Sequence, residues 1–175
     1  MGFTADTING TAARGIGLAG MLLQGVTPDI FARLPVKDGS VVMTNHPAFA
    51  IGHLSVYPSR VFILGGEDPS AVALPDEQEE LFKIGAECVD DPDGTIYPAM
   101  EEVVRNFQTG YAAALQLVAS WDEQKLAGPH QGGEAYQKMF PNLGVAVNFL
   151  LNSHMMMHLG QISAWRRFMG LGSAM

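Results

Sequence analysis

The pattern of apolar residues along the chain predicts four long helices. The spacing is clearest between Pro98 and Trp121, where large apolar residues recur three or four positions apart and therefore share one helix face. These residues are Val103, Val104, Phe107, Tyr111, Leu115 and Val118. We expect this stretch to form the third helix of the core.

The other three helices are predicted from apolar stretches and from the residues that begin and end them. The first is expected over residues 11–34, with Thr11 as a possible N-cap. The second is expected over residues 48–64, after an Asn-His-Pro start and before a Gly-Gly stop, with Pro58 as a kink. The last is expected over residues 143–169, before two closely spaced glycines.

The segments between these helices predict the order of the fold. Residues 65–97 hold clusters of Gly, Pro and Asp around an acidic segment at 75–83, which favours a long crossover with one small helix. Residues 126–141 contain Gly, Pro and His and are expected to connect the third helix to the last one. No alternating strand pattern of convincing length is present. The sequence therefore predicts an all-α fold, a four-helix bundle with a long crossover between helices two and three, as a single domain over residues 1–175.

Composition narrows the class of protein. With 47% hydrophobic residues in 175, the chain can build one core without disulfides, and its single cysteine, Cys88, favours a reducing compartment such as the cytoplasm. The formal net charge of −8 opposes nucleic-acid binding, because a phosphate backbone would be repelled. The apolar stretch at residues 15–26 is too short for a membrane span, so we expect no membrane partner.

The candidate chemistry lies in the histidines. His154 and His158 are four residues apart in the last predicted helix, on a face that is otherwise apolar, so their Cβ atoms would lie roughly 6 Å apart. Two protonated imidazoles would repel there, whereas a shared cation suits two neutral rings. His53, in the middle of the second predicted helix and beside Gly52, can supply a third imidazole. Three histidines plus water is the open arrangement of catalytic zinc.

The same residues carry a resemblance to a known family. Gly52-His53-Leu54, together with His154-x3-His158-Leu-Gly-Gln161-Ile-Ser-x-Trp-Arg-Arg-x-x-Gly170, resembles the DinB-like (YfiT-type) four-helix-bundle proteins over nearly the full chain. The resemblance implies that His53, His154 and His158 bind a divalent metal ion. The family often forms homodimers, and it includes thiol-dependent transferases and isomerases as well as many members without known activity. The resemblance therefore implies a homodimer and, for a catalytic member, a low-molecular-weight thiol as co-substrate.

Two hypotheses for function follow. The first is a metal-dependent transferase or hydrolase acting on a small molecule, with zinc or nickel as the metal and iron not excluded. No residue is nominated as the general base. The second is a non-catalytic bundle that is braced by its metal or binds a small ligand. If the pair of His154 and His158 is considered alone, two neutral, hydrogen-bonded histidines in the core or a cleft explain it as well as a metal site does.

Other sequence signals are given structural explanations. His46 is expected in an exposed first helical turn, or at most at the rim of the pocket, and His130 in a solvated loop. The glycines at 15, 17 and 20 match a dinucleotide-binding pattern, but no buried strand precedes them, so close helix packing explains them better. Met155 follows His154 where metalloproteases have a glutamate, which argues against peptidase activity.

Overall fold

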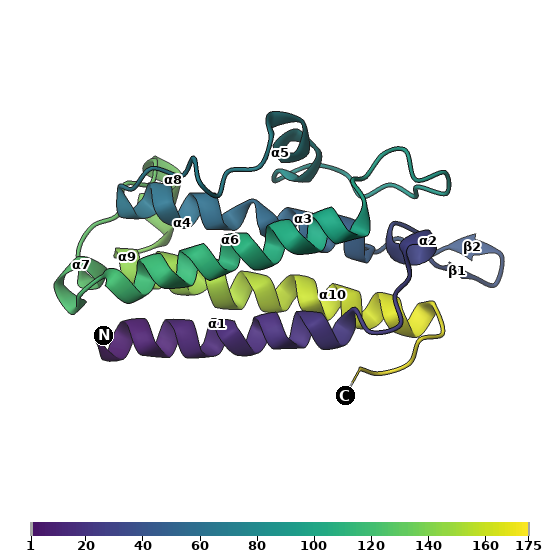
Figure 1. Cartoon of the computed structure of the whole chain (residues 1–175), viewed down its shortest axis with the longest axis horizontal. Coiled ribbons are helices and arrows are strands. Elements are labelled where there is room, and N and C mark those ends of the chain that lie inside the picture. Colours follow the sequence, from purple (N-terminus) through teal and green to yellow (C-terminus); the bar gives the residue numbers. More distant parts are fainter. Residues whose placement is uncertain (1, 175) are drawn as a thin grey trace.

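The computed structural model of this chain describes residues 2–174, and helices make up most of them (Figure 1). Within that range the strands are a single antiparallel pair, β1 (Val36–Lys37) and β2 (Ser40–Val41). The prediction of an all-α fold is therefore confirmed at the level of class. The helices are α1 (Phe3–Leu22), α2 (Pro28–Phe31), α3 (Pro47–Ser55), α4 (Tyr57–Gly65), α5 (Asp76–Phe82), α6 (Met100–Ser120), α7 (Glu123–Ala127), α8 (Glu134–Met139), α9 (Leu143–Asn148), the π-helix η1 (Phe149–His154) and α10 (Met155–Phe168).

The long helices pack side by side around one apolar core. In Figure 1, α6 lies along α3 and α4, while α1 lies along α10 and also contacts α6. The core between them includes Ile51, Leu54, Tyr111 and Leu151, all buried. Arg166, also buried, donates hydrogen bonds of 2.7 and 2.6 Å to the carbonyl oxygens of Leu22, the last residue of α1, and of Gln24, and so joins α10 to the end of α1.

The expected bounds of the first helix are wrong at both ends. α1 begins at Phe3, well before Thr11, and its polar first turns are helical because Ala5, Ile8 and other small or apolar residues face the core. It ends at Leu22, not near residue 34, because Gly25 adopts a left-handed conformation with φ of 75°. The short helix α2 follows as a separate element.

The second predicted helix is present but divided into α3 and α4. The division falls at Val56, two residues before Pro58, which has no N–H to donate back to the preceding turn. Gly66, with φ of 77°, ends α4 where the stop was expected. The kink at Pro58 and the glycine stop are therefore both confirmed.

The connections are confirmed in part. α5 forms within the segment at residues 75–83 where a small helix was expected. The connection expected over residues 126–141 is present and contains short helices, since α7 extends to Ala127 and α8 occupies Glu134–Met139. Among helices formed by residues 2–174, none has both the length and the apolar character needed to cross a bilayer.

Candidate metal centre

Three buried histidines meet at one point between the helices. His53 lies in α3, His154 ends η1 and His158 lies one turn later in α10. One ring nitrogen from each lies within 4.8 Å of the others, which is close enough for the three to hold a metal ion. The ring centroids of His53 and His158 are 4.6 Å apart, as are those of His154 and His158. The predicted convergence of these histidines is confirmed.

The packing of α3 explains how His53 reaches the other two rings. α3 contacts both α10 and α5. At Gly52 a Cβ atom would overlap the ring of Phe82, the last residue of α5, so the missing side chain lets the crossover lie directly on α3. The element that approaches α3 most closely at Gly52 is therefore the crossover helix α5.

Hydrogen bonds fix the orientation of two of the three rings. His53 Nδ1–H donates to the carbonyl oxygen of Phe82 at 2.6 Å. His158 Nδ1–H donates to Oε1 of Gln161 at 2.8 Å, and that oxygen also accepts a 3.0 Å hydrogen bond from Asn45 Nδ2. Because each neutral ring carries one proton, the Nε2 atoms of His53 and His158 are left as acceptors, the tautomer in which Nε2 can bind a metal.

The third ring lies beside the second. His154 Nε2 is 3.0 Å from His158 Nε2, and its buried Nδ1 has no hydrogen-bond partner among residues 2–174. A tetrahedral ion with bonds of about 2.1 Å holds its nitrogen ligands about 3.4 Å apart. The separation of these two nitrogens is near that value, and one nitrogen from each of the three rings lies within 4.8 Å of the others. The residues therefore fit a bound divalent ion.

Burial keeps the histidines neutral. It lowers the pKa of His158 to about 4, with the charge of a protonated His53 as a second cause. It likewise lowers the pKa of His154 to about 4, and both neighbouring imidazoles add to that effect. The pKa of His53 is also lowered by burial, although its bond to the Phe82 carbonyl opposes the change. All three rings can act as neutral ligands near pH 7 without first losing a proton.

Two groups at the site were not predicted from sequence. Tyr57, buried in α4, places its hydroxyl 3.2 Å from His53 Nε2, and burial raises its pKa to about 12, so the phenol stays protonated and can donate. Gln161, with Asn45 behind it, orients His158. A signal for both was present, since Tyr57 follows His53 by four residues and Gln161 follows His158 by three.

A cleft of about 460 Å³ opens onto the three histidines. One wall is formed by the segment from Lys83 to Ala86, directly after α5, and another by α8 and the start of η1. His53, His154 and His158 all line the cleft, so a small molecule can reach the centre from this side.

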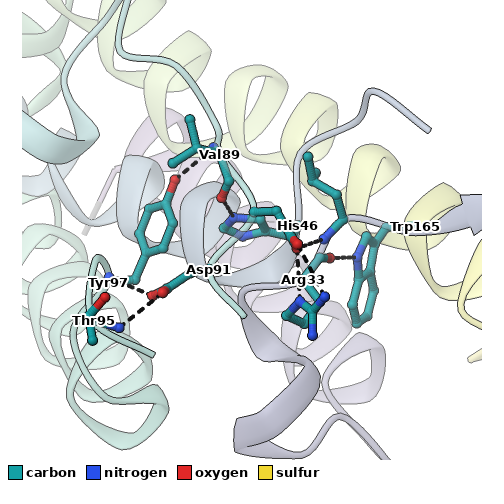
Figure 2. Close-up of polar contacts among 9 residues, drawn as sticks. Arg33, His46, Val89, Asp91, Thr95, Tyr97 and Trp165 are labelled. Carbon is teal, nitrogen blue, oxygen red and sulfur yellow. Dashed lines mark hydrogen bonds and ion pairs between the residues drawn. The ribbon is translucent and has the colours of Figure 1, made fainter. Parts of the chain in front are cut away.

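The expectation of an exposed His46 is wrong, and His46 is also not part of the metal centre. It is fully buried as the N-cap of α3, where Nδ1 accepts from the backbone N–H of Phe49 at 3.2 Å. Its Nε2–H donates to the carbonyl of Val89 at 2.9 Å (Figure 2). The burial arises because the crossover returns over the start of α3, and burial is also the main cause that lowers the pKa of His46.

His130 is likewise buried, contrary to the expected solvated loop. Its Nε2–H donates to the Phe140 carbonyl at 3.2 Å, and its Nδ1 accepts from the N–H of Gly132 at 3.1 Å. The ring thus joins the two ends of the segment that carries α8. It supports one wall of the cleft and lies outside the three-histidine group.

A polar network fixes the end of the crossover (Figure 2). The carboxylate of the buried Asp91 accepts from the N–H groups of Thr95 and Tyr97 at 2.9 and 3.1 Å. Trp165 donates from its indole to the carbonyl of Arg33 at 2.7 Å, and Arg33 forms an ion pair with Asp90. The contacts of Arg33 join the crossover to the residues after α2 and to α10.

The arrangement can bind a divalent ion and leave one side of it accessible. A scan against protein-family models and a search of curated proteins found no match to this chain. The function proposed below therefore depends on the geometry and chemistry of the site.

Proposed function

We propose that the protein binds a divalent metal ion through Nε2 of His53, His154 and His158, with zinc or nickel as the metal. The observation that carries this proposal is the set of tautomers. Two of the rings donate Nδ1–H to fixed oxygen acceptors, so their Nε2 lone pairs face a common buried centre. In the metal-free protein the Nε2 lone pair of His53 accepts from the Tyr57 hydroxyl, and that of His158 accepts from Nε2–H of His154. A divalent ion that replaces the proton between the last two rings would use all three Nε2 lone pairs.

We further propose that the site is catalytic, with a transferase or hydrolase reaction. A bound ion would supply Lewis acidity and lower the pKa of a coordinated water or thiol. The histidines hold and orient that ion, and Tyr57 can donate a hydrogen bond to a group beside His53. The cleft supports catalysis over a purely structural site, because it gives a substrate access to the same three rings.

A non-catalytic metal brace is the second candidate. Among the residues that line the cleft within the described part of the chain, none is Asp or Glu, so no carboxylate is placed as a general base. Tyr57 also lies close enough to His53 to occupy the remaining side of an ion. Both features suit a site that joins α3 to α10 without turning over a substrate.

We propose the DinB-like four-helix bundle as the fold behind this site. In support, α1, α3 with α4, α6, and α9 through α10 are the long packed units, and residues 66–99 connect the second to the third. The histidine positions match those quoted in the resemblance. A thiol co-substrate and a homodimer belong to the same proposal.

Metal content tests the first proposal. Protein purified without an affinity-tag metal should contain about one zinc or nickel ion per chain by elemental analysis, and His154→Gln should lose it. His130→Gln, which removes a buried histidine outside the site, should retain it. A metal-free wild type that takes up no zinc or nickel on titration overturns the metal centre.

Turnover tests the catalytic proposal separately. A panel of thiol-transfer and hydrolysis reactions should include at least one that the metal-loaded wild type accelerates and His53→Gln does not. Full metal occupancy with no turnover across the panel would favour the brace. Turnover that survives in His53→Gln would place the activity elsewhere.

A further inference from the structure

We infer that the cleft beside the three histidines binds the apolar body of a small molecule, an aryl or branched alkyl group, whose ligating head, such as a thiol, reaches the metal centre. The statement about the head rests on the proposed function, whereas the statement about the body rests on the lining of the cleft alone. It narrows the substrate class from small molecules in general to apolar ones.

Aromatic rings dominate the walls of the cleft. They come from three separate parts of the chain, which are α3 with α4, α8 with the residue after it, and η1. The rings of Tyr136 and Phe140 have centroids 5.8 Å apart, and those of Phe140 and Phe149 are 5.2 Å apart, so they form a continuous surface. The aromatic lining residues are Phe49, Tyr57, Tyr136, Phe140 and Phe149.

The volume and shape suit one small molecule. About 460 Å³ lies within the range of small-ligand pockets and holds an aryl ring with a short substituent. The histidines form one side of this space, while Ile84 and Met139, which are 75% and 64% exposed, border it on the side of solvent. An apolar ligand would cover these two side chains as well as the rings, which adds to the apolar area removed from water.

The charges of the lining disfavour a polar substrate body. Within the described chain, Lys83 is the one Lys or Arg that lines the cleft, and it forms an ion pair with Glu80. A peptide-like or sugar-linked thiol would bury carboxylates, amides or hydroxyls against rings that offer few partners, and unpaired polar groups are costly to bury. The cleft therefore favours an uncharged, apolar body over the hydrophilic low-molecular-weight thiols.

A comparison of three thiols on the cobalt-loaded protein tests this inference. Benzyl mercaptan, 2-mercaptoethanol and glutathione share the thiol and differ in the body, and binding is followed by the sulfur-to-cobalt charge-transfer band. Benzyl mercaptan should bind about tenfold to a hundredfold more tightly than 2-mercaptoethanol, the factor expected for burying one phenyl ring. Glutathione should bind no more tightly than 2-mercaptoethanol.

A pair of double variants separates the cleft from the metal. Ile84→Asp/Met139→Asp adds two carboxylates beside the cleft and should lower the affinity for benzyl mercaptan at least about tenfold. The cobalt stoichiometry and the affinity for 2-mercaptoethanol should not change. Phe3→Asp/Val36→Asp adds the same charge at exposed positions away from the cleft and should change neither affinity. Equal affinities of benzyl mercaptan and 2-mercaptoethanol for the wild type, or equal effects of the two double variants, overturn the inference.

A binding measurement on the metal-free protein separates the test of the apolar cleft from the test of the proposed metal centre. Toluene has no ligating head, so its binding to metal-free protein, measured by ligand-observed NMR, reports on the cleft alone. Toluene should bind the wild type and the control double variant, and bind Ile84→Asp/Met139→Asp at least about tenfold more weakly. If cobalt does not bind, the proposed function fails, and the toluene result still decides the cleft. Absence of toluene binding overturns the apolar site.

Discussion

The position of one proton on each imidazole decides whether the three histidines can bind a metal. His158 depends on a side chain for this, because Gln161 accepts its Nδ1–H and is itself held by Asn45. His53 depends on a backbone carbonyl, which substitution at Phe82 would not remove. A substitution at Gln161 can therefore remove the hydrogen bond that orients His158 without replacing any of the three histidines.

Replacing Gln161 with alanine should weaken metal binding by about tenfold to a hundredfold, the usual cost of losing such a support. The ring of His158 would lose both its orientation and its preference for the Nδ1–H tautomer. Competition with a chromophoric chelator measures the affinity. Gln116→Ala, an exposed position in α6, serves as the control and should bind as the wild type does. An unchanged affinity in Gln161→Ala would show that helix packing alone orients the ring.

The depressed pKa values predict how stability depends on pH in the metal-free protein. His154 and His158 have pKa values of about 4 in the folded state, against about 6.5 in an unfolded chain. Between these values the unfolded chain binds more protons, so the free energy of unfolding falls as the pH is lowered from about 6.5 towards 4. The loss should be on the order of 3 kcal/mol for each of the two histidines.

Urea unfolding at a series of pH values measures this dependence. The double variant His154→Gln/His158→Gln lacks both groups and should show a flatter curve over the same range, with the remaining slope due to His46 and His53, whose pKa values burial also lowers. Parallel curves for the variant and the wild type would mean that the two imidazoles are protonated in the folded protein near their ordinary pKa.

Sequence predicts the ligands of this site better than their neighbours. His154 and His158 are detectable because spacing on one helix is local information, and His53 because its helix was expected to face theirs. The burial of His46 depends on Val89, a distant part of the crossover, and that of His130 on the folding back of α8. Contacts set by tertiary packing leave no local pattern, so both residues were placed wrongly in solvent.

At the scale of helices, the crossover helix α5 controls the site through one close contact. Phe82 packs where a side chain at residue 52 would lie, and the carbonyl of the same residue holds His53. The steric fit at Gly52 and the orientation of His53 are therefore coupled.

Gly52→Ala should destabilise the protein by about 1–3 kcal/mol and also weaken metal binding. The added methyl group overlaps the Phe82 ring, which is fully buried and must move together with its carbonyl. Gly160→Ala is the matched control, because that glycine lies in α10 with open space around it. The control should be neutral or stabilise by up to about 1 kcal/mol, since alanine favours a helix over glycine.

Thermal unfolding and metal affinity, measured on both variants, check this prediction. A loss of stability in Gly52→Ala without any loss of metal affinity would show that Phe82 moves aside without disturbing His53. A destabilised Gly160→Ala would show instead that the effect belongs to glycine replacement in general and says nothing about the crossover.

The π-helix shows what sequence could not predict about the elements. Residues 143–169 were expected to form one regular helix, and the structure divides them into α9, η1 and α10. The wider turn of η1 ends at His154, so it shifts the register of α9 relative to the two histidines. A local apolar pattern does not distinguish one extra residue in a turn from a regular helix, and π-turns are frequent at functional sites.

At the scale of the molecule, the core does not require the site. α6 contributes Phe107, Tyr111 and Val118 to a continuous apolar interior that spans all of the long helices, and it contributes no ligand. The all-α class was predictable because helical periodicity and the absence of alternating strands are properties of the sequence alone. The path of the crossover was not predictable, because it is set by contacts between distant residues, such as the ion pair of Arg33 with Asp90.

Removing the metal should therefore lower the stability of the protein without unfolding it. At a free ion concentration one hundred times the dissociation constant, binding adds about 2.7 kcal/mol, which corresponds to a rise in Tm of about 5–10 °C for a chain of this size. Circular dichroism should show the same helix content before and after chelation, and the rise should return when zinc is added. His158→Gln should show no metal-dependent change in Tm. Loss of helix on chelation would mean that the ion is needed for folding, which would favour the brace over the catalytic site.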